Sequence, residues 1–437
     1  MSETILNSLA QRYVDLTLCK TKYDPWDVYW YADKPFWRRE SMNFSREYKI
    51  YPYVDLGEKK EGRTLKNILD ESVHLQESLE LYRKSAAEAE LDRVNYLIDH
   101  TINLQTRTRV LLGETMSYDA MTEGCYSLRA PDCDYAVFDA MKQELDAALP
   151  GKGPVAERVM NFENRITIPR DRVPAVLTAA THVFHDCAVK NMDISSGNMP
   201  RLRFRDLGGE MEFLSILFGY EYDHIEMERN FALDYPFTVD KVVEMIGHEM
   251  EPGHLTYFEL RLKTMIDTCF PEMQIIAQYS PSSAFCEGSA RMAVYMCFDH
   301  SIEQLVDFER EVIFEQGRLD KSLAACMPLW HRFRDLAGYG KLEATRNRWN
   351  GVWDKEEAGA FLEKYLFAAP GSGAQTVDRL AADDGHFVSH DYARDVMRDY
   401  YKAMTKNTDE QWRLYQKLCR SHMSMRGIRD LTYRIDF

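Results

Sequence analysis

Two histidines flank a carboxylate in one short segment of the chain. The segment reads His248-Glu249-Met-Glu-Pro252-Gly253-His254. Imidazole nitrogens are common zinc ligands, and a carboxylate beside such a ligand can take a proton from water on the metal. In the usual zinc-protease helix the histidines are four residues apart, so both rings project from one face. These residue types predict a metal site on His248 and His254, with Glu249 as the general base.

The spacing of the two histidines requires a break in the helix. They are six residues apart, and six steps of about 100° would put His254 on a different helix face from His248. Pro252 has no N–H and its ring clashes with the preceding turn, while Gly253 accepts unusual backbone dihedrals. We therefore expect the helix to bend at Pro252 and Gly253, so that His254 returns to the metal.

A third ligand is expected from another helix. Glu287 lies in Phe285-Cys-Glu-Gly-Ser-Ala290, at the start of an apolar helical run. Two histidines and one glutamate leave a coordination position open, which is typical of catalytic zinc. The predicted cofactor is one divalent ion, zinc in the first place, with Fe²⁺ and Mn²⁺ as alternatives.

The paired motifs resemble a known family. His248-Glu-Met-Glu-Pro-Gly-His254 followed by Phe285-Cys-Glu-Gly288 is similar to the domain-of-unknown-function family 885, in which His-Glu-x-x-Pro-Gly-His-His precedes Phe-x-Glu-Gly-Trp-Ala. That family is similar to the gluzincin metallopeptidases, which are helical proteins with a downstream glutamate ligand. The resemblance extends from about residue 200 to the C-terminus, and it is the main support for Glu287 as a ligand.

Departures from the family pattern affect the surroundings of the site. Leu255 stands where the family has a second adjoining histidine, and Ser289 replaces a tryptophan. The segment 384–390 corresponds to a family segment that ends in tyrosine, so His390 takes the place of a group that could polarise a substrate oxygen. This alignment makes His390 a candidate catalytic residue and His386 a candidate substrate-binding residue, with exposed surface histidines as the alternative.

Arg394 follows one turn after His390 and could bind a substrate carboxylate. A solvated ion pair is the other interpretation of this arginine. His182 and His185 share a helix face at three-residue spacing. Because Val, Leu and Ala surround them, we interpret both as hydrogen-bonded structural histidines.

The elements that must position these residues are mainly helices. Apolar residues recur at three- and four-residue steps over 65–82 and 94–102. Asp354 followed by Glu357 has the pattern of a capping box. Alternating residues around Gly208-Gly209, within 200–235, predict a small hairpin or sheet just before the metal helix. The predicted fold is a mainly α, gluzincin-like metallohydrolase body with this small β element near the active-site helix.

No repeat or linker marks a domain boundary. We predict a single helical domain over 1–437, with an N-terminal lobe of about 1–195 and a metal-binding C-terminal lobe of about 196–437 around a cleft.

Composition narrows the class of protein. The chain has 437 residues and a net charge of −16, which argues against binding to phosphate backbones. It has no apolar run long enough to cross a membrane and no recognisable secretory signal, so we expect a cytoplasmic protein without nucleic-acid or membrane partners. Nine cysteines, scattered singly, are expected to be reduced thiols.

These features predict a metal-dependent hydrolase that cleaves an amide or peptide bond in a small peptide or metabolite. Two alternatives stay open. The same three ligands form the facial triad of non-haem iron oxygenases, so redox or lyase chemistry is one of them. The altered segment 384–390 supports the other, a catalytically degenerate protein that binds a ligand or partner.

Overall fold

The structure is a computed structural model of the whole chain. It describes residues 4–25, 27–31, 62–194, 199–205, 217–221, 224–230, 236–381, 385 and 387–435. The described part is mainly helical, which confirms the prediction of a mainly α fold. No helix in these ranges is long and apolar enough to cross a membrane.

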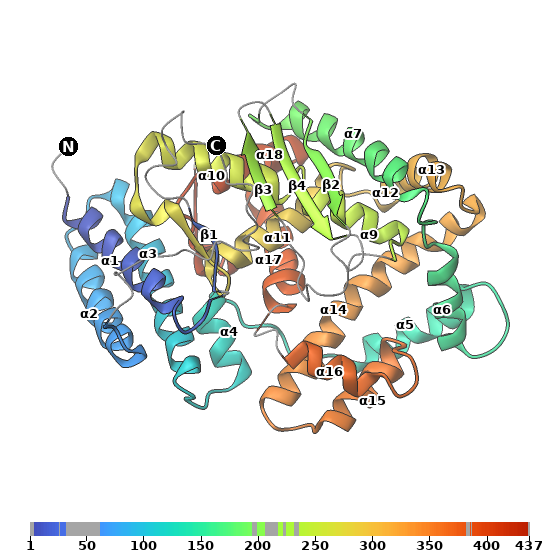
Figure 1. The fold of residues 1–437 in the computed structure, drawn as a ribbon, viewed down its shortest axis with the longest axis horizontal. Helices are drawn as coiled ribbons and strands as arrows, with labels where there is room; N and C mark the ends of the chain where they lie inside the picture. The colour runs from blue at the N-terminus through green and yellow to red at the C-terminus, as the bar shows by residue number, and fades with distance from the viewer. Residues whose placement is uncertain are drawn as a thin grey trace.

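The N-terminal helices form one end of the molecule and continue along its lower and right-hand edges in Figure 1. The predicted helical run from 65 begins at a capping box, in which Thr64 and Asn67 exchange side-chain and backbone hydrogen bonds. The helices in this half are α1 (Ile5–Lys20), α2 (Leu65–Arg83), α3 (Glu88–Leu111), α4 (Tyr118–Tyr126), α5 (Tyr135–Ala148), α6 (Val155–Arg165) and α7 (Val173–Asn191).

The second half supplies the central helices and the right-hand end of Figure 1. The predicted capping box is confirmed, because Asp354 accepts from the Glu357 N–H and Glu357 accepts from the Asp354 N–H. The elements are α9 (Val239–Val243), η4 (Glu244–His248), α10 (His254–Thr268), η5 (Pro271–Gln274), α11 (Pro281–Met296), α12 (Ile302–Phe308), η6 (Glu309–Phe314), α13 (Glu315–Gly317), η7 (Lys321–Cys326), α14 (Met327–Trp349), α15 (Lys355–Tyr365), α16 (Gly373–Ala381), η8 (Val388–Tyr392), α17 (Ala393–Met404), α18 (Thr408–Cys419) and α19 (Met425–Arg429).

Two small sheets accompany the helices. The predicted β element before the metal helix is a three-stranded sheet of β2 (Arg201–Arg205), β3 (Leu217–Glu221) and β4 (His224–Asn230) in the order β2-β4-β3. Strand β4 pairs parallel with β2 and antiparallel with β3. A second sheet, which the sequence analysis did not predict, joins β1 (Val28–Tyr31) to β5 (Ile275–Ala277) in antiparallel register.

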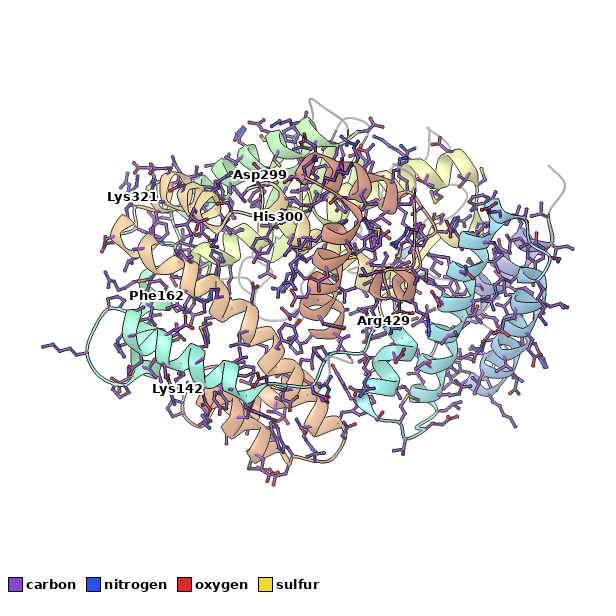
Figure 2. All side chains as sticks on the ribbon, turned by 180° about the vertical axis from the view of Figure 1, so that it is seen from behind. Lys142, Phe162, Asp299, His300, Lys321 and Arg429 are labelled. Carbon is purple, nitrogen blue, oxygen red and sulfur yellow. The ribbon has the colours of Figure 1, made fainter. Side chains whose placement is uncertain are left out.

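Buried apolar side chains form several cores, and two of the largest cross residue 195. One packs Phe184 of α7 against Val243 and Trp330 from later helices. Another packs Tyr126 against Phe285 and later helices. Figure 2 shows from behind that side chains fill the spaces between the ribbons. The division into two lobes at about residue 195 stays a prediction. The two shared cores pack side chains from both sides of this position together.

All nine cysteines are free thiols in the structure, as the sequence analysis expected.

Candidate metal centre

The helix that carries His248 ends where the sequence predicts a break. Helix α9 widens into the π-helix η4, which ends at His248, and a new helix, α10, begins at His254. The turn between them brings the backbone of Gly253 against that of His248, so that a Cβ atom on residue 253 would lie 1.8 Å from the His248 carbonyl oxygen. No side chain fits there. Glycine therefore permits the sharp return that six-residue spacing requires.

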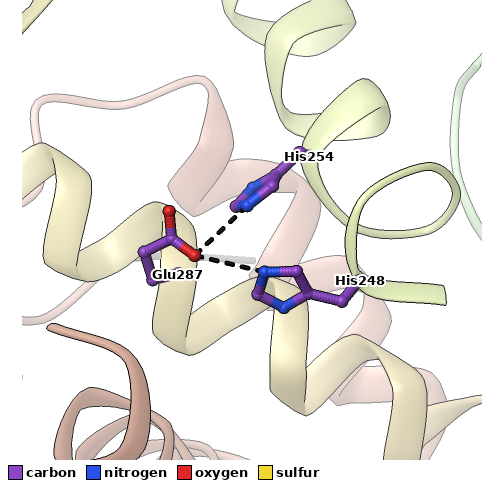
Figure 3. A group of neighbouring side chains, drawn as sticks. All are labelled: His248, His254 and Glu287. Carbon is purple, nitrogen blue, oxygen red and sulfur yellow. Dashed lines mark ion pairs between the residues drawn. The ribbon is translucent and has the colours of Figure 1, made fainter. Parts of the chain in front are cut away.

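The break brings the two predicted histidine ligands together. Their ring centroids lie 4.5 Å apart, with the ring planes at 71°. Each Nε2 atom lies 3.2 Å from Oε2 of Glu287, which comes from helix α11 (Figure 3). One donor atom from each of His248, His254 and Glu287 lies within 4.8 Å of the other two. All three predicted ligands thus converge on one small volume.

His390 joins this group from a fourth element. Its Nε2 atom lies 2.9 Å from the same oxygen of Glu287, and its ring is stacked at 25° to that of His248, with centroids 6.3 Å apart. It is not one of the three residues whose donor atoms lie mutually within 4.8 Å. His390 therefore contacts the shared carboxylate without being part of the compact ligand set.

Two glycines allow the elements that carry Glu287 and His390 to approach. A Cβ atom on Gly288 would lie 2.7 Å from the carbonyl group of Ala393, at the junction of η8 and α17. A Cβ atom on Gly338 of α14 would lie 2.2 Å from the carboxyl carbon of Asp391. Neither contact is possible for a larger residue without a shift of the backbone or of Asp391. These close approaches fix η8 against α11 and α14.

Burial and charge set the protonation of the four groups. Burial lowers the pKa of His248, and the neighbouring charge of His254 lowers it further. Burial acts to lower the pKa of His254 and of His390, but contacts with Glu287, joined at His254 by Cys286, raise both pKa values overall. Burial raises the pKa of Glu287, but the charges of His254 and His390 outweigh it and hold that pKa well below its usual range. The ionised carboxylate of Glu287 thus faces several imidazoles. Because these lie close together, protonation of one disfavours protonation of another.

These residues suit a divalent cation. Glu287 Oε2 is buried and has ion-pair contacts with three imidazole nitrogens, yet no contact to it from the described residues has hydrogen-bond geometry. A metal binds ionised carboxylate and neutral imidazole, so a cation bound here would displace the proton that the raised pKa of His254 favours. Two histidines and a glutamate form a donor set that Zn²⁺, Fe²⁺ and Mn²⁺ all accept.

The second ring nitrogen of His254 contacts a thiol, where a metal-binding histidine often has a carboxylate. Its Nδ1 atom lies 3.1 Å from Sγ of the buried Cys286, the residue that precedes Glu287. A ligand histidine commonly uses its second nitrogen to hold the ring in place. Nδ1 of His248 has no hydrogen-bond partner among the described residues. The orientation of His254 therefore rests in part on a thiol.

The turn between the two histidines is anchored from outside. Glu251 Oε2 lies 2.6 Å from Nδ1 of His185 on α7. Tyr415 of α18 donates a hydrogen bond of 3.0 Å to the Pro252 carbonyl. His185 is thus hydrogen-bonded and largely buried, as expected of a structural histidine. These two contacts hold the turn against two separate helices.

Arg291 ties three of the site's elements together. It lies four residues after Glu287 on α11 and reaches Asp391 of η8 at 2.6 Å and Glu244 of η4 at 2.9 Å. Four-residue spacing puts Arg291 and Glu287 on one helix face, a signal that could have identified Arg291 from the sequence. Cys286 and Tyr415 carried no such signal, because their roles depend on packing between helices.

The other predicted site residues have different outcomes. Glu249 is half-buried and directly follows His248. The charge of Glu249 acts to raise the pKa of His248. Arg394 is buried and is ion-paired with Asp335 and Asp395. His386 lies outside the described residues. The predicted roles of all three in catalysis or substrate binding stay predictions.

A cavity of about 260 Å³ adjoins the candidate centre. His248 forms part of its wall, together with Arg291, Asp391, Phe387 and residues of α14. This volume is slightly below the roughly 300 Å³ at which ligand pockets commonly begin. The cavity therefore suits a small ligand placed beside His248.

The comparison with solved structures finds distant likenesses. No family model matches the chain, and no curated protein matches it. The chain is similar to the crystal structure of a "putative lipoprotein" from Colwellia psychrerythraea, with a TM-score of 0.48 and 11% sequence identity, over 84% of this chain and 69% of that chain. Such a likeness carries no argument about function, so the chemistry must be argued from the geometry.

Proposed function

We propose that the chain is a metal-dependent hydrolase, with zinc as the expected metal, that cleaves an amide or peptide bond in a small peptide or metabolite. The observation that carries this proposal is the convergence of His248, His254 and Glu287, whose donor atoms lie within 4.8 Å of one another. Three protein ligands are typical of catalytic zinc sites, because a fourth position is left for water or substrate. The resemblance to family 885 supports the same ligands.

The chain's own residues have distinct roles in the proposed reaction. A bound divalent ion would supply Lewis acidity, polarising a carbonyl and making water acidic. Glu249, next to His248, would accept a proton at its carboxylate and deliver it to the leaving amine. His390, beside Glu287, would donate from its imidazole to a substrate oxygen that gains negative charge. The small cavity beside His248 would hold the substrate.

Metal analysis of the purified protein tests the proposal. We expect about one zinc per chain, lost in His248→Ala and Glu287→Ala. His74→Ala is the matched control, because His74 is an exposed histidine far from the site in sequence, and Glu77 is its ion-pair partner among the described residues. The control variant should keep its metal. Elemental analysis by mass spectrometry provides the measurement.

Glu249→Gln separates chemistry from metal binding. It should keep the metal and lose at least about a hundredfold in kcat on a panel of N-acyl amino acids and dipeptides. Full turnover by this variant would exclude Glu249 as the base. Bound iron with oxygen consumption would favour the oxygenase alternative, and a protein that binds no metal would favour the degenerate binding protein.

A further inference from the structure

The cavity beside His248 has a charged wall. Its cationic side chains come from α11, α14 and α17, and its acidic side chains come from α9, η4, α14 and η8. The cations are Arg291, Arg334, Lys341 and Arg394, and the acids are Asp240, Glu244, Asp335 and Asp391. In a small cavity these charges must be compensated by each other or by a ligand.

Each of the three arginines is compensated within the wall. When a guanidinium group forms an ion pair with a carboxylate, the carboxylate neutralises most of its charge locally. The pairs are Arg291 with Asp391 and Glu244, Arg334 with Asp240, and Arg394 with Asp335 and Asp395. The arginines therefore stabilise the wall and are not available as anchors for a ligand.

Lys341 is the exception among the cations. It forms no ion pair with any of the described residues, and its Nζ atom lies 5.7 Å from the centroid of the Phe387 ring. Lys341 is half-buried. Burial lowers the pKa of its ammonium group and the charge of Arg334 lowers it further, while the charges of Asp391 and Glu244 act to raise it. A half-buried ammonium without a carboxylate partner is a ready anchor for an anionic ligand.

We propose that Lys341 binds a carboxylate of the substrate, so that the hydrolase acts on small substrates with a free carboxylate, such as N-acyl amino acids or short peptides. The part of this inference that concerns hydrolysis rests on the proposed function, whereas the binding of a carboxylate by Lys341 does not depend on it. One unpaired cation favours a single negative charge. Any residual negative charge on the wall carboxylates would repel a dianion such as a phosphate monoester more strongly than a monoanion.

The helix α14 explains how Lys341 reaches this position. His331, Arg334, Gly338 and Lys341 follow one another at three- and four-residue steps and line the same cavity. His331 and Arg334 are already paired, with Glu309 at 2.7 Å and with Asp240 at 3.1 Å. Lys341 thus lies at the end of this helix face, beyond His331 and Arg334, whose side chains already have ion-pair partners.

Binding of a matched pair of probes tests the assignment without turnover. N-benzoylglycine carries the carboxylate, and N-benzoylglycinamide is its neutral counterpart. Calorimetric titration of the full-length protein should show the acid binding about tenfold or more tightly than the amide, which corresponds to about 1.4 kcal/mol. Lys341→Met should abolish this preference, and Lys341→Arg should retain most of it.

Controls separate a local role from a general charge effect. Lys402→Met removes an exposed lysine of α17 and should leave the preference unchanged. Thermal unfolding should confirm that each variant is folded. A wild-type protein that does not favour the acid, or a Lys341→Met variant that still favours it, would overturn the proposal.

Failure of the proposed function is distinguishable from failure of this inference. If the protein hydrolyses none of the panel but binds the acid in a Lys341-dependent way, the anion site stands and the hydrolase does not. If acids and amides are hydrolysed with equal kcat/KM, the hydrolase stands and the role of Lys341 does not.

Discussion

His390 Nε2 lies 2.9 Å from Oε2 of Glu287, nearer to that oxygen than Nε2 of either His248 or His254, both at 3.2 Å. The contact joins η8 to α11, and α11 also packs closely through Gly288 against Ala393, the residue that follows η8. His390 can therefore orient the carboxylate ligand as well as face a substrate. A residue that orients a ligand and a residue that is itself a ligand differ in how much metal affinity is lost when each is removed.

His390→Ala should keep the metal but bind it more weakly. Removal of a group that orients a ligand typically costs about 10- to 100-fold in metal affinity, whereas removal of a ligand costs far more. Competition with a chromophoric chelator measures the affinity, with His248→Ala as the reference for loss of a ligand. If the two variants lose the metal equally, His390 belongs to the ligand set itself.

Gly253→Ala should destabilise the protein and its metal site together. The added Cβ would lie 1.8 Å from the His248 carbonyl oxygen, so the turn must open and His254 must move. We expect a loss of at least about 2 kcal/mol in the free energy of unfolding, as for overpacked cores. Denaturant titration measures it, and metal content should fall in parallel.

Gly317→Ala is the control for this glycine. Its added Cβ would meet the flexible Leu319 side chain at 3.3 Å and the Ile168 side chain at an ordinary contact distance of 3.8 Å. Its effect should stay below about 1 kcal/mol. Equal stability of the Gly253 and Gly317 variants would mean that the turn tolerates a side chain.

Cys286→Val should weaken metal binding through His254. The substitution removes the sulfur 3.1 Å from His254 Nδ1 but keeps a buried apolar residue of similar size. We expect about a 10- to 100-fold loss in affinity, and a smaller loss for Cys286→Ser, which keeps an acceptor. Cys125→Val, at another buried thiol, controls for the change in packing. Serine and valine variants with the same affinity would argue against a role for the thiol.

The ion-pair cluster at Glu272 should make stability depend on acid pH. Burial raises the pKa of Glu272, but the ion pair with His422 and the hydrogen bonds from Arg93 together outweigh burial, and the resulting pKa is about 2. A lowered pKa adds stability that is complete above the unfolded value, near 4.5, and is lost as the pH falls through about 2. The shift corresponds to roughly 3 kcal/mol for this fully buried group.

Glu272→Gln should therefore be less stable than the wild type at pH 7, and the difference should narrow between about pH 5 and 2. Denaturant titrations across this range measure both proteins. Glu71→Gln is the control, because Glu71 and its partner Arg63 are 38% and 40% exposed, and ion pairs open to solvent are worth at most about 1 kcal/mol. A difference that stays constant with pH would show that the charge of Glu272 does not contribute.

The local features of the site could be predicted from the sequence. The break between His248 and His254 follows from Pro252 and Gly253, because the missing N–H and the missing Cβ act within one turn of the chain. Helical periodicity and the capping box at Asp354 are also local, so the mainly α fold was predictable. The alternating pattern at 200–235 indicated the small sheet for the same reason.

The rest depends on which helices pack together. Cys286 beside His254, Arg291 between Glu244 and Asp391, and the cavity with its unpaired Lys341 all join segments far apart in the sequence. Their positions follow from close helix contacts at Gly288 and Gly338, where the partner is set by the burial of many side chains at once. The sequence by itself determined the residue types and the bend that a metal site needs. Only the tertiary structure decided which charges are neutralised beside that site and which one is left for a ligand.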